Sequence, residues 1–210
     1  MDFLLLVVLI WGVGFALRTK ARKQRIAVLA HYLRNYDIEK LMERLVAGYM
    51  RALDEKEPAR QQQIWELQTP VENSLASQFA NFAQALASAP APTNGANFRI
   101  STQAIAFPFS ILIEKLQGDK GSFDLRAAIR IHADGIAAVV ANADGLSPKE
   151  RAYTLLAEMY LMQHTCHWYC KSKAVASARM QLRNQTSYAQ VLQSVSPRTR
   201  QAYRALIGAQ

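Results

Sequence analysis

The chain lacks the short motifs that identify common enzyme classes. Its 210 residues contain no H-E-x-x-H, no G-x-x-x-x-G-K-[ST], no G-x-G-x-x-G and no G-x-S-x-G. The sequence therefore carries no signature of a zinc peptidase, a P-loop nucleotide site, a dinucleotide fold or a serine-hydrolase elbow. An enzyme whose residues meet only in the folded chain stays open, but the sequence favours a non-catalytic role. We expect no cofactor.

Cysteine and sustained apolar–polar alternation are also scarce. The two cysteines, Cys166 and Cys170, lie close together in a chain that we place in the cytoplasm, so a structural disulfide is not the default expectation. Alternation is nowhere sustained, so we predict no convincing strand.

Acidic residues are missing from the end of the chain. The net charge is +9, but residues 159–210 hold seven Lys or Arg and no acid, residues 1–25 carry +4, and residues 26–158 carry −2. Basic blocks at both ends predict an anionic partner. A membrane surface is the first candidate, because basic residues beside a membrane are attracted to anionic lipid, and nucleic acid is the second.

Only one long hydrophobic run is present, Phe3 to Leu17. Five cations follow it at once: Arg18, Lys20, Arg22, Lys23 and Arg25. Because Lys and Arg stay on the cytoplasmic side, this pattern predicts a single-pass anchor in a bacterial inner membrane, with the N-terminus outside and the main domain cytoplasmic.

Two alternatives compete with the anchor. The run reaches only about 22 Å against a hydrocarbon core of about 30 Å, so a monotopic or buried helix is one alternative. Arg18 and Lys20 could offset the shortfall by snorkelling to the headgroups. A cleaved signal peptide is the other, but Asp2 precedes the run, the positive charge follows it, and no A-x-A site comes after Leu17.

The remaining chain predicts an all-α fold of about six to eight helices. We divide it into a membrane anchor with its basic flank, a membrane-proximal helical segment, an Ala/Pro/Gly loop and a helical domain with a basic C-terminal part: residues 1–25, 26–88, 89–97 and 98–210. Apolar spacing over 26–53 fits one long helix or two.

Capping signals place the other helices. Pro58 precedes a short helix over 59–67, and Thr69-Pro70-Val71-Glu72 predicts a new helix that runs to about Ser88. The later predicted helices begin beside Ser122, Ser147 and Ser196 and cover residues 123–141, 148–182 and 197–207. The apolar run 104–113 is expected in the core.

One dense cluster of metal-ligating types occurs: His164, Cys166, His167 and Cys170. Cys166 and Cys170 lie one helical turn apart and could share an ion, whereas the histidines could join only if the helix frays or another chain contributes. A reactive-thiol role is a further alternative. Buried packing explains the cluster best, because aromatic and methionine residues surround it.

The basic C-terminal part completes the candidate lipid-contact set with the cations Lys171, Lys173, Arg179, Arg183, Arg198, Arg200 and Arg204. An ordinary solvated face, contact with anionic lipid, and contact with nucleic acid or an acidic protein are the three interpretations.

The sequence thus favours a membrane-anchored cytoplasmic adaptor or assembly protein that contacts lipid and binds a protein partner or a second copy of itself. The alternatives are a metal or redox protein using the Cys/His cluster, and a membrane-tethered nucleic-acid binder.

Overall fold

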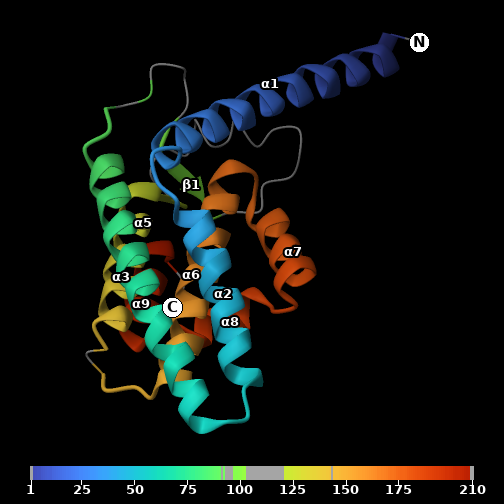
Figure 1. Ribbon diagram of the computed structural model, residues 1–210. Coiled ribbons are helices and arrows are strands. Elements are labelled where there is room, and N and C mark those ends of the chain that lie inside the picture. Colours follow the sequence, from blue (N-terminus) through green and yellow to red (C-terminus); the bar gives the residue numbers. More distant parts are fainter. Residues whose placement is uncertain (1, 91, 93–96, 103–120, 143, 209–210) are drawn as a thin grey trace.

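The computed structural model describes residues 2–90, 92, 97–102, 121–142 and 144–208 (Figure 1). The all-α prediction is confirmed, with eight helices among these residues. The helices are α1 (Asp2–Leu33), α2 (Ile38–Asp54), α3 (Pro58–Ala87), α5 (Leu125–Val140), α6 (Pro148–Cys170), α7 (Lys173–Asn184), α8 (Tyr188–Ser194) and α9 (Pro197–Ile207).

Helix α6 is the centre of the body. It contacts α1, α2, α5, α7 and α8, and α3 packs on both α2 and α5. Because α6 is surrounded, its buried residues lie on several faces instead of one stripe. The core holds large aromatic side chains that are almost fully buried, among them Tyr49, Phe79, Phe82, Tyr169 and Tyr203. Burying each such side chain stabilises the fold by about 1.5–3 kcal/mol.

The segment over 26–53 forms two helices, which settles the alternative left open by its spacing. α1 ends at Leu33, and α2 begins at Ile38, which is 2% exposed. Between them, the backbone N–H of Asp37 donates to the Gln78 side chain of α3 at 2.7 Å. Burial of Ile38 and this hydrogen bond hold the turn against α3.

The predicted break at Thr69-Pro70 is wrong, because α3 runs unbroken through Pro70. An internal proline removes one backbone hydrogen bond and costs about 3 kcal/mol. The apolar residues on either side of it share one helical face, with Ile64 and Trp65 before it and Leu75 and Phe79 after it, all buried. Burial of this continuous stripe offsets the proline.

The predicted helix over 148–182 is also wrong in its extent. Its start is confirmed, since Ser147 and Glu150 form the reciprocal capping box. It ends at Cys170, and Ser172 caps a separate helix α7 by accepting the N–H of Val175 at 3.3 Å. The break folds α7 back on α6 and buries Ala176 and Met180, which a straight helix would leave without that partner.

Two short strands correct the prediction of none. β1 (Arg99–Ser101) pairs antiparallel with β2 (Ser122–Asp124), and Ile100 lies opposite Phe123. Three residues per strand are too few to show alternation. The prediction that the apolar run 104–113 is buried lies outside the described residues, as do residues 91 and 93–96 of the predicted loop.

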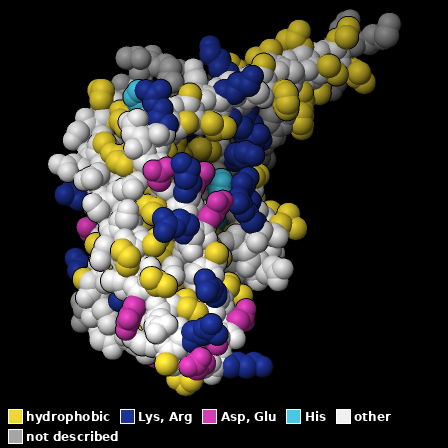
Figure 2. Space-filling model, in the orientation of Figure 1, with side chains coloured by type: hydrophobic (Ala, Val, Ile, Leu, Met, Phe, Trp, Pro, Cys, Tyr) yellow, Lys and Arg dark blue, Asp and Glu magenta, His cyan; other side chains and the backbone are white. Residues whose placement is uncertain are grey.

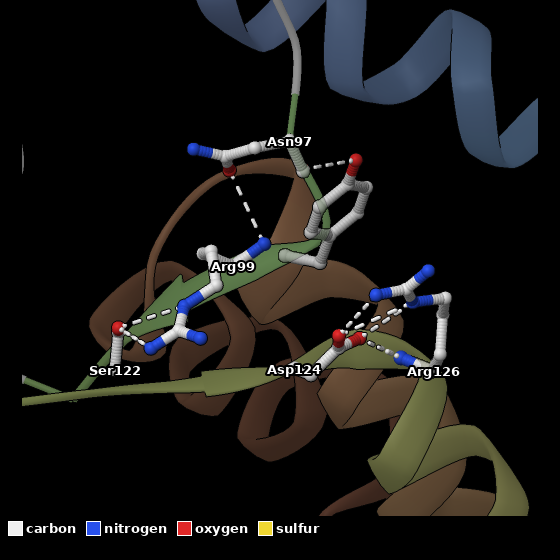
Figure 3. A network of polar contacts seen from close by, with 6 residues as sticks. Asn97, Arg99, Ser122, Asp124 and Arg126 are labelled. Atoms are coloured by element: carbon white, nitrogen blue, oxygen red, sulfur yellow. Dashed lines mark hydrogen bonds and ion pairs between the residues drawn. The ribbon is translucent and has the colours of Figure 1, made fainter. Parts of the chain in front are cut away.

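Polar contacts tie this small sheet to its neighbours (Figure 3). Asp124, in place of the predicted Ser122, caps α5 by accepting the Arg126 N–H at 2.7 Å. Burial raises the pKa of Asp124, but hydrogen bonds from Arg126 outweigh it, and the pKa is lowered. The Tyr169 hydroxyl donates to the Asn97 carbonyl at 2.9 Å, which joins the segment just before β1 to α6.

Candidate membrane-facing surface

The first half of α1 stands clear of the body (Figure 1). Eleven large apolar side chains between Leu4 and Leu17 are 37–71% exposed. The helix continues to Leu33 without a break, and its 32 residues reach about 48 Å. α1 is therefore long and apolar enough to cross a bilayer.

The second half of α1 is docked on the body. Val28 and Leu29 are buried, and of the basic flank Arg18, Arg22 and Arg25 are half-buried whereas Lys20 and Lys23 are exposed. The guanidinium of Arg25 donates to the Tyr169 carbonyl of α6 at 3.4 Å and lies 5.6 Å from the centre of the Tyr169 ring. The predicted basic flank thus includes the joint between α1 and α6.

The structure divides the predicted C-terminal cations into two groups. Lys171, Lys173, Arg179 and Arg183 lie at the end of α6 and on α7, whereas Arg198, Arg200 and Arg204 lie on α9.

Two of these cations have local partners. The Lys173 ammonium lies 5.1 Å from the Trp168 ring centre and 4.9 Å from that of Tyr188, in cation–π contacts that hold α7 to α6 and α8. Arg200 donates to the Gln193 carbonyl at 2.9 Å. These two side chains therefore stabilise the fold locally.

An open groove of about 410 Å³ lies between α6 and the outer face of α7, and we call it the α6–α7 groove. Its lining combines cations with apolar side chains: His167, Lys171, Val175, Ala178, Arg179, Leu182 and Arg183. Sequence reasoning missed Val175 and Leu182, although their spacing of seven residues places them on one helical face. Burial lowers the pKa of His167, and the charges of Arg179, Lys171 and Arg183 lower it further.

The predicted Cys/His cluster is spread over different faces of α6. Cys166 donates its S–H toward Met162 Sδ at 3.9 Å, and His164 shares a 3.0 Å hydrogen bond with Ser177 of α7. Burial raises the pKa of Cys166 to about 12 and that of Cys170 to about 11, which disfavours the thiolate that a metal needs. Within the described ranges, no three His, Cys, Asp or Glu side chains are grouped to hold a metal ion.

Sequence reasoning also missed three buried polar groups. Glu72, 1% exposed, accepts the Tyr49 hydroxyl at 2.6 Å and pairs with Arg151 at 3.0 Å. Glu158, fully buried, accepts the Ser196 N–H at 3.1 Å, and burial raises its pKa.

The third group is centred on His132 of α5. Its Nε2 lies 2.9 Å from the Thr165 hydroxyl, which in turn lies 2.9 Å from the Tyr203 hydroxyl. Burial, aided by His164, lowers the pKa of His132 to about 3. The fold therefore holds this imidazole neutral at physiological pH.

Because His132 stays neutral in the folded state, we expect His132→Leu to flatten the loss of stability in acid. The unfolded imidazole takes up a proton below about pH 6.5, and the folded one does so only near pH 3, so stability is lost as the pH falls through this window. Between pH 6.5 and 5 this contributes about 2 kcal/mol. Urea titrations in detergent at pH 7 and 5 measure the free energy of unfolding of the wild type and of His132→Leu. An equal loss of stability between these pH values in both proteins would contradict the assignment.

Comparisons with protein-family models, curated proteins and solved structures found no match for this chain. Its function must therefore be inferred from the geometry of its own residues. Two features carry that inference, the exposed apolar half of α1 and the mixed basic and apolar surface of α7.

Proposed function

We propose that this protein is a membrane-anchored adaptor or assembly protein that holds a helical body at the cytoplasmic face of a bacterial inner membrane and recruits a protein partner there. The observation that carries the proposal is the division of α1. Its apolar half is exposed from Leu4 to Leu17, and its basic half is docked on the body without an intervening linker. Exposed apolar surface of this size on a single helix is stable only when lipid or protein covers it.

The position of the charges supports the proposed orientation. The cations that follow Leu17 belong on the cytoplasmic side, and the body follows them. An uncleaved anchor is supported by the continuity of α1, because Val28 and Leu29, near its end, are buried in the core. The same continuous helix holds Arg25 against Tyr169.

The body also offers places for a partner. Outside α1 and α7, four large apolar side chains of the described residues are more than 40% exposed: Met50, Leu53, Leu67 and Tyr153. Single exposed apolar residues are ordinary on a protein surface, so they serve here as positions at which to test for contact.

Topology and integrity test the anchor. A fluorescent protein fused after Gln210 should fold and fluoresce in the cytoplasm, and the purified chain should begin at Met1 by mass spectrometry. A chain shortened near Leu17, or a dark and exported fusion, would refute the anchored cytoplasmic domain.

In-cell photocrosslinking tests the partner. A benzoylphenylalanine probe at Leu67 or Tyr153 should give a discrete protein adduct, and adducts at twice the chain mass would identify a second copy as the partner. Probes at the exposed polar positions Glu43 and Arg44 are the controls. Absence of any protein adduct from probes at Met50, Leu53, Leu67 and Tyr153 would overturn recruitment. Stoichiometric metal in the purified protein, or nucleic-acid binding that weakens steeply with salt, would support the metal-protein or the nucleic-acid alternative.

A further inference from the structure

The cations of the α6–α7 groove form no ion pair with any residue that the structure describes. In the part of the chain that the structure describes, Lys171, Arg179 and Arg183 form no ion pair or hydrogen bond through their side chains. No acidic residue occurs anywhere in 159–210. Mutual repulsion of these cations is unfavourable, so the groove is electrostatically complementary to an anion.

Apolar side chains lie among these cations. Leu182 is 85% exposed and Val175 is 39% exposed, and both line the groove. A helix that presents exposed apolar residues beside Lys and Arg has the composition of a helix that lies in the headgroup region of a membrane. A free anion would satisfy the charges but would leave Leu182 in water.

The groove also lies on the side of the body where α1 joins α6. Arg25 of α1 bonds to Tyr169, and Lys171, at the edge of the groove, follows Tyr169 by two residues. Arg25 is eight residues beyond Leu17, or about 12 Å along the helix. The headgroup layer occupies the first 5–7 Å or so beyond the hydrocarbon, and electrostatic attraction to it extends farther by one Debye length, about 8 Å. The level of Arg25 lies within the reach of this attraction.

The pictures agree with this placement. Figure 1 shows α7 at the edge of the body toward which the free half of α1 points. Lys and Arg side chains follow from α1 down to α7 in the space-filling view, and hydrophobic side chains lie at the outer edge of α7 (Figure 2).

We propose that the α6–α7 groove binds the phosphate of an anionic phospholipid from the bilayer that α1 crosses. Arg179 and Arg183 donate to the phosphate oxygens, and Lys171 adds a third positive charge. Val175 and Leu182 contact the apolar part of the same lipid. This proposal rests on the anchoring part of the proposed function and adds to it a second point of attachment to the membrane.

Native mass spectrometry of the full-length protein tests the groove. The protein is released by mild detergent from vesicles of phosphatidylcholine and phosphatidylglycerol, and retained lipids are counted. We expect the wild-type protein to retain phosphatidylglycerol. The retained amount should be at least tenfold lower in Arg179→Gln/Arg183→Gln. The matched control is Lys56→Gln/Arg60→Gln, which makes the same change in charge at two exposed cations, one in the α2–α3 turn and one in the first turn of α3, far from the groove.

Each outcome decides the proposal. Loss of the lipid from the groove variant alone supports it. Equal retention in all three proteins, or equal loss from both variants, overturns it, because the lipid would then be held elsewhere or by net charge. Displacement of the lipid by millimolar inorganic phosphate would also overturn it, since the site would then be one for a free anion.

A second readout comes from His167 in the groove lining. A bound phosphate should raise the pKa of this imidazole, which NMR measures in nanodiscs with and without phosphatidylglycerol. The rise should vanish in Arg179→Gln/Arg183→Gln, and a pKa that is the same in both kinds of nanodisc would count against the groove. Failure of the anchor itself would appear separately, in the topology and chain-mass measurements.

Discussion

Replacing Arg151 with Met is expected to lower the free energy of unfolding by about 3–5 kcal/mol. The Arg151 guanidinium lies 3.0 Å from Glu72, whose carboxylate is almost completely buried between α3 and α6. Without the guanidinium, the carboxylate keeps, among the described residues, only the hydroxyl of Tyr49 as a partner. An uncompensated buried charge is what makes breaking such a pair so costly.

The matched experiment is a double variant. Arg151→Met with Glu72→Gln removes both charges and keeps an acceptor for the Tyr49 hydroxyl, so it should recover most of the lost stability. Urea unfolding in detergent, followed by circular dichroism, measures all three proteins. A single variant within about 1 kcal/mol of the wild type would show that the pair contributes only as a surface pair does.

Gly135→Ala should lower stability by about 3 kcal/mol, although alanine normally favours a helix over glycine by about 1 kcal/mol. A Cβ at this position would overlap the Thr199 hydroxyl and lie 2.8 Å from Glu158 Oε2. Neither neighbour can move freely. Thr199 is 2% exposed and bonded to Ser196, whose N–H in turn donates to Glu158.

Gly48→Ala is the control for this prediction. Its Cβ would also overlap a neighbour, but that neighbour is the amide end of Gln68, a flexible and only partly buried side chain. We expect no loss, and up to about 1 kcal/mol of gain from helix propensity. If thermal unfolding ranks the two variants equally, the close approach of α5 to α6 and α9 is not as tight as described.

Local chemistry made the helices predictable. The capping residues Ser147 and Ser196 begin the helices that they were expected to begin, since a cap depends only on nearby backbone groups. The same logic failed at Pro70, where the gain from burying a stripe on both sides depends on partners distant in sequence. It failed again at Lys171, where the local cap Ser172 decides for a break only together with the packing of α7 on α6.

The candidate membrane-facing surface was partly predictable for the same reason. A run of apolar residues followed by cations is visible in any reading of the first 25 residues. The groove was not, because predicting one helix over 148–182 hid the turn that brings α7 against α6. The buried polar residues did leave a signal: His132 lies three residues after Ile129 and four before Ile136, on the face that packs inward.

The unbroken path of α1 has a consequence for how this protein meets others. When the first half of α1 lies across a bilayer, the docked second half fixes the tilt of the body, because no flexible linker separates them. The body can then only slide in the plane of the membrane and rotate about the membrane normal. A partner in the same membrane then searches two dimensions and one angle instead of a volume and three angles, so a weak contact surface suffices at the high effective concentration that results.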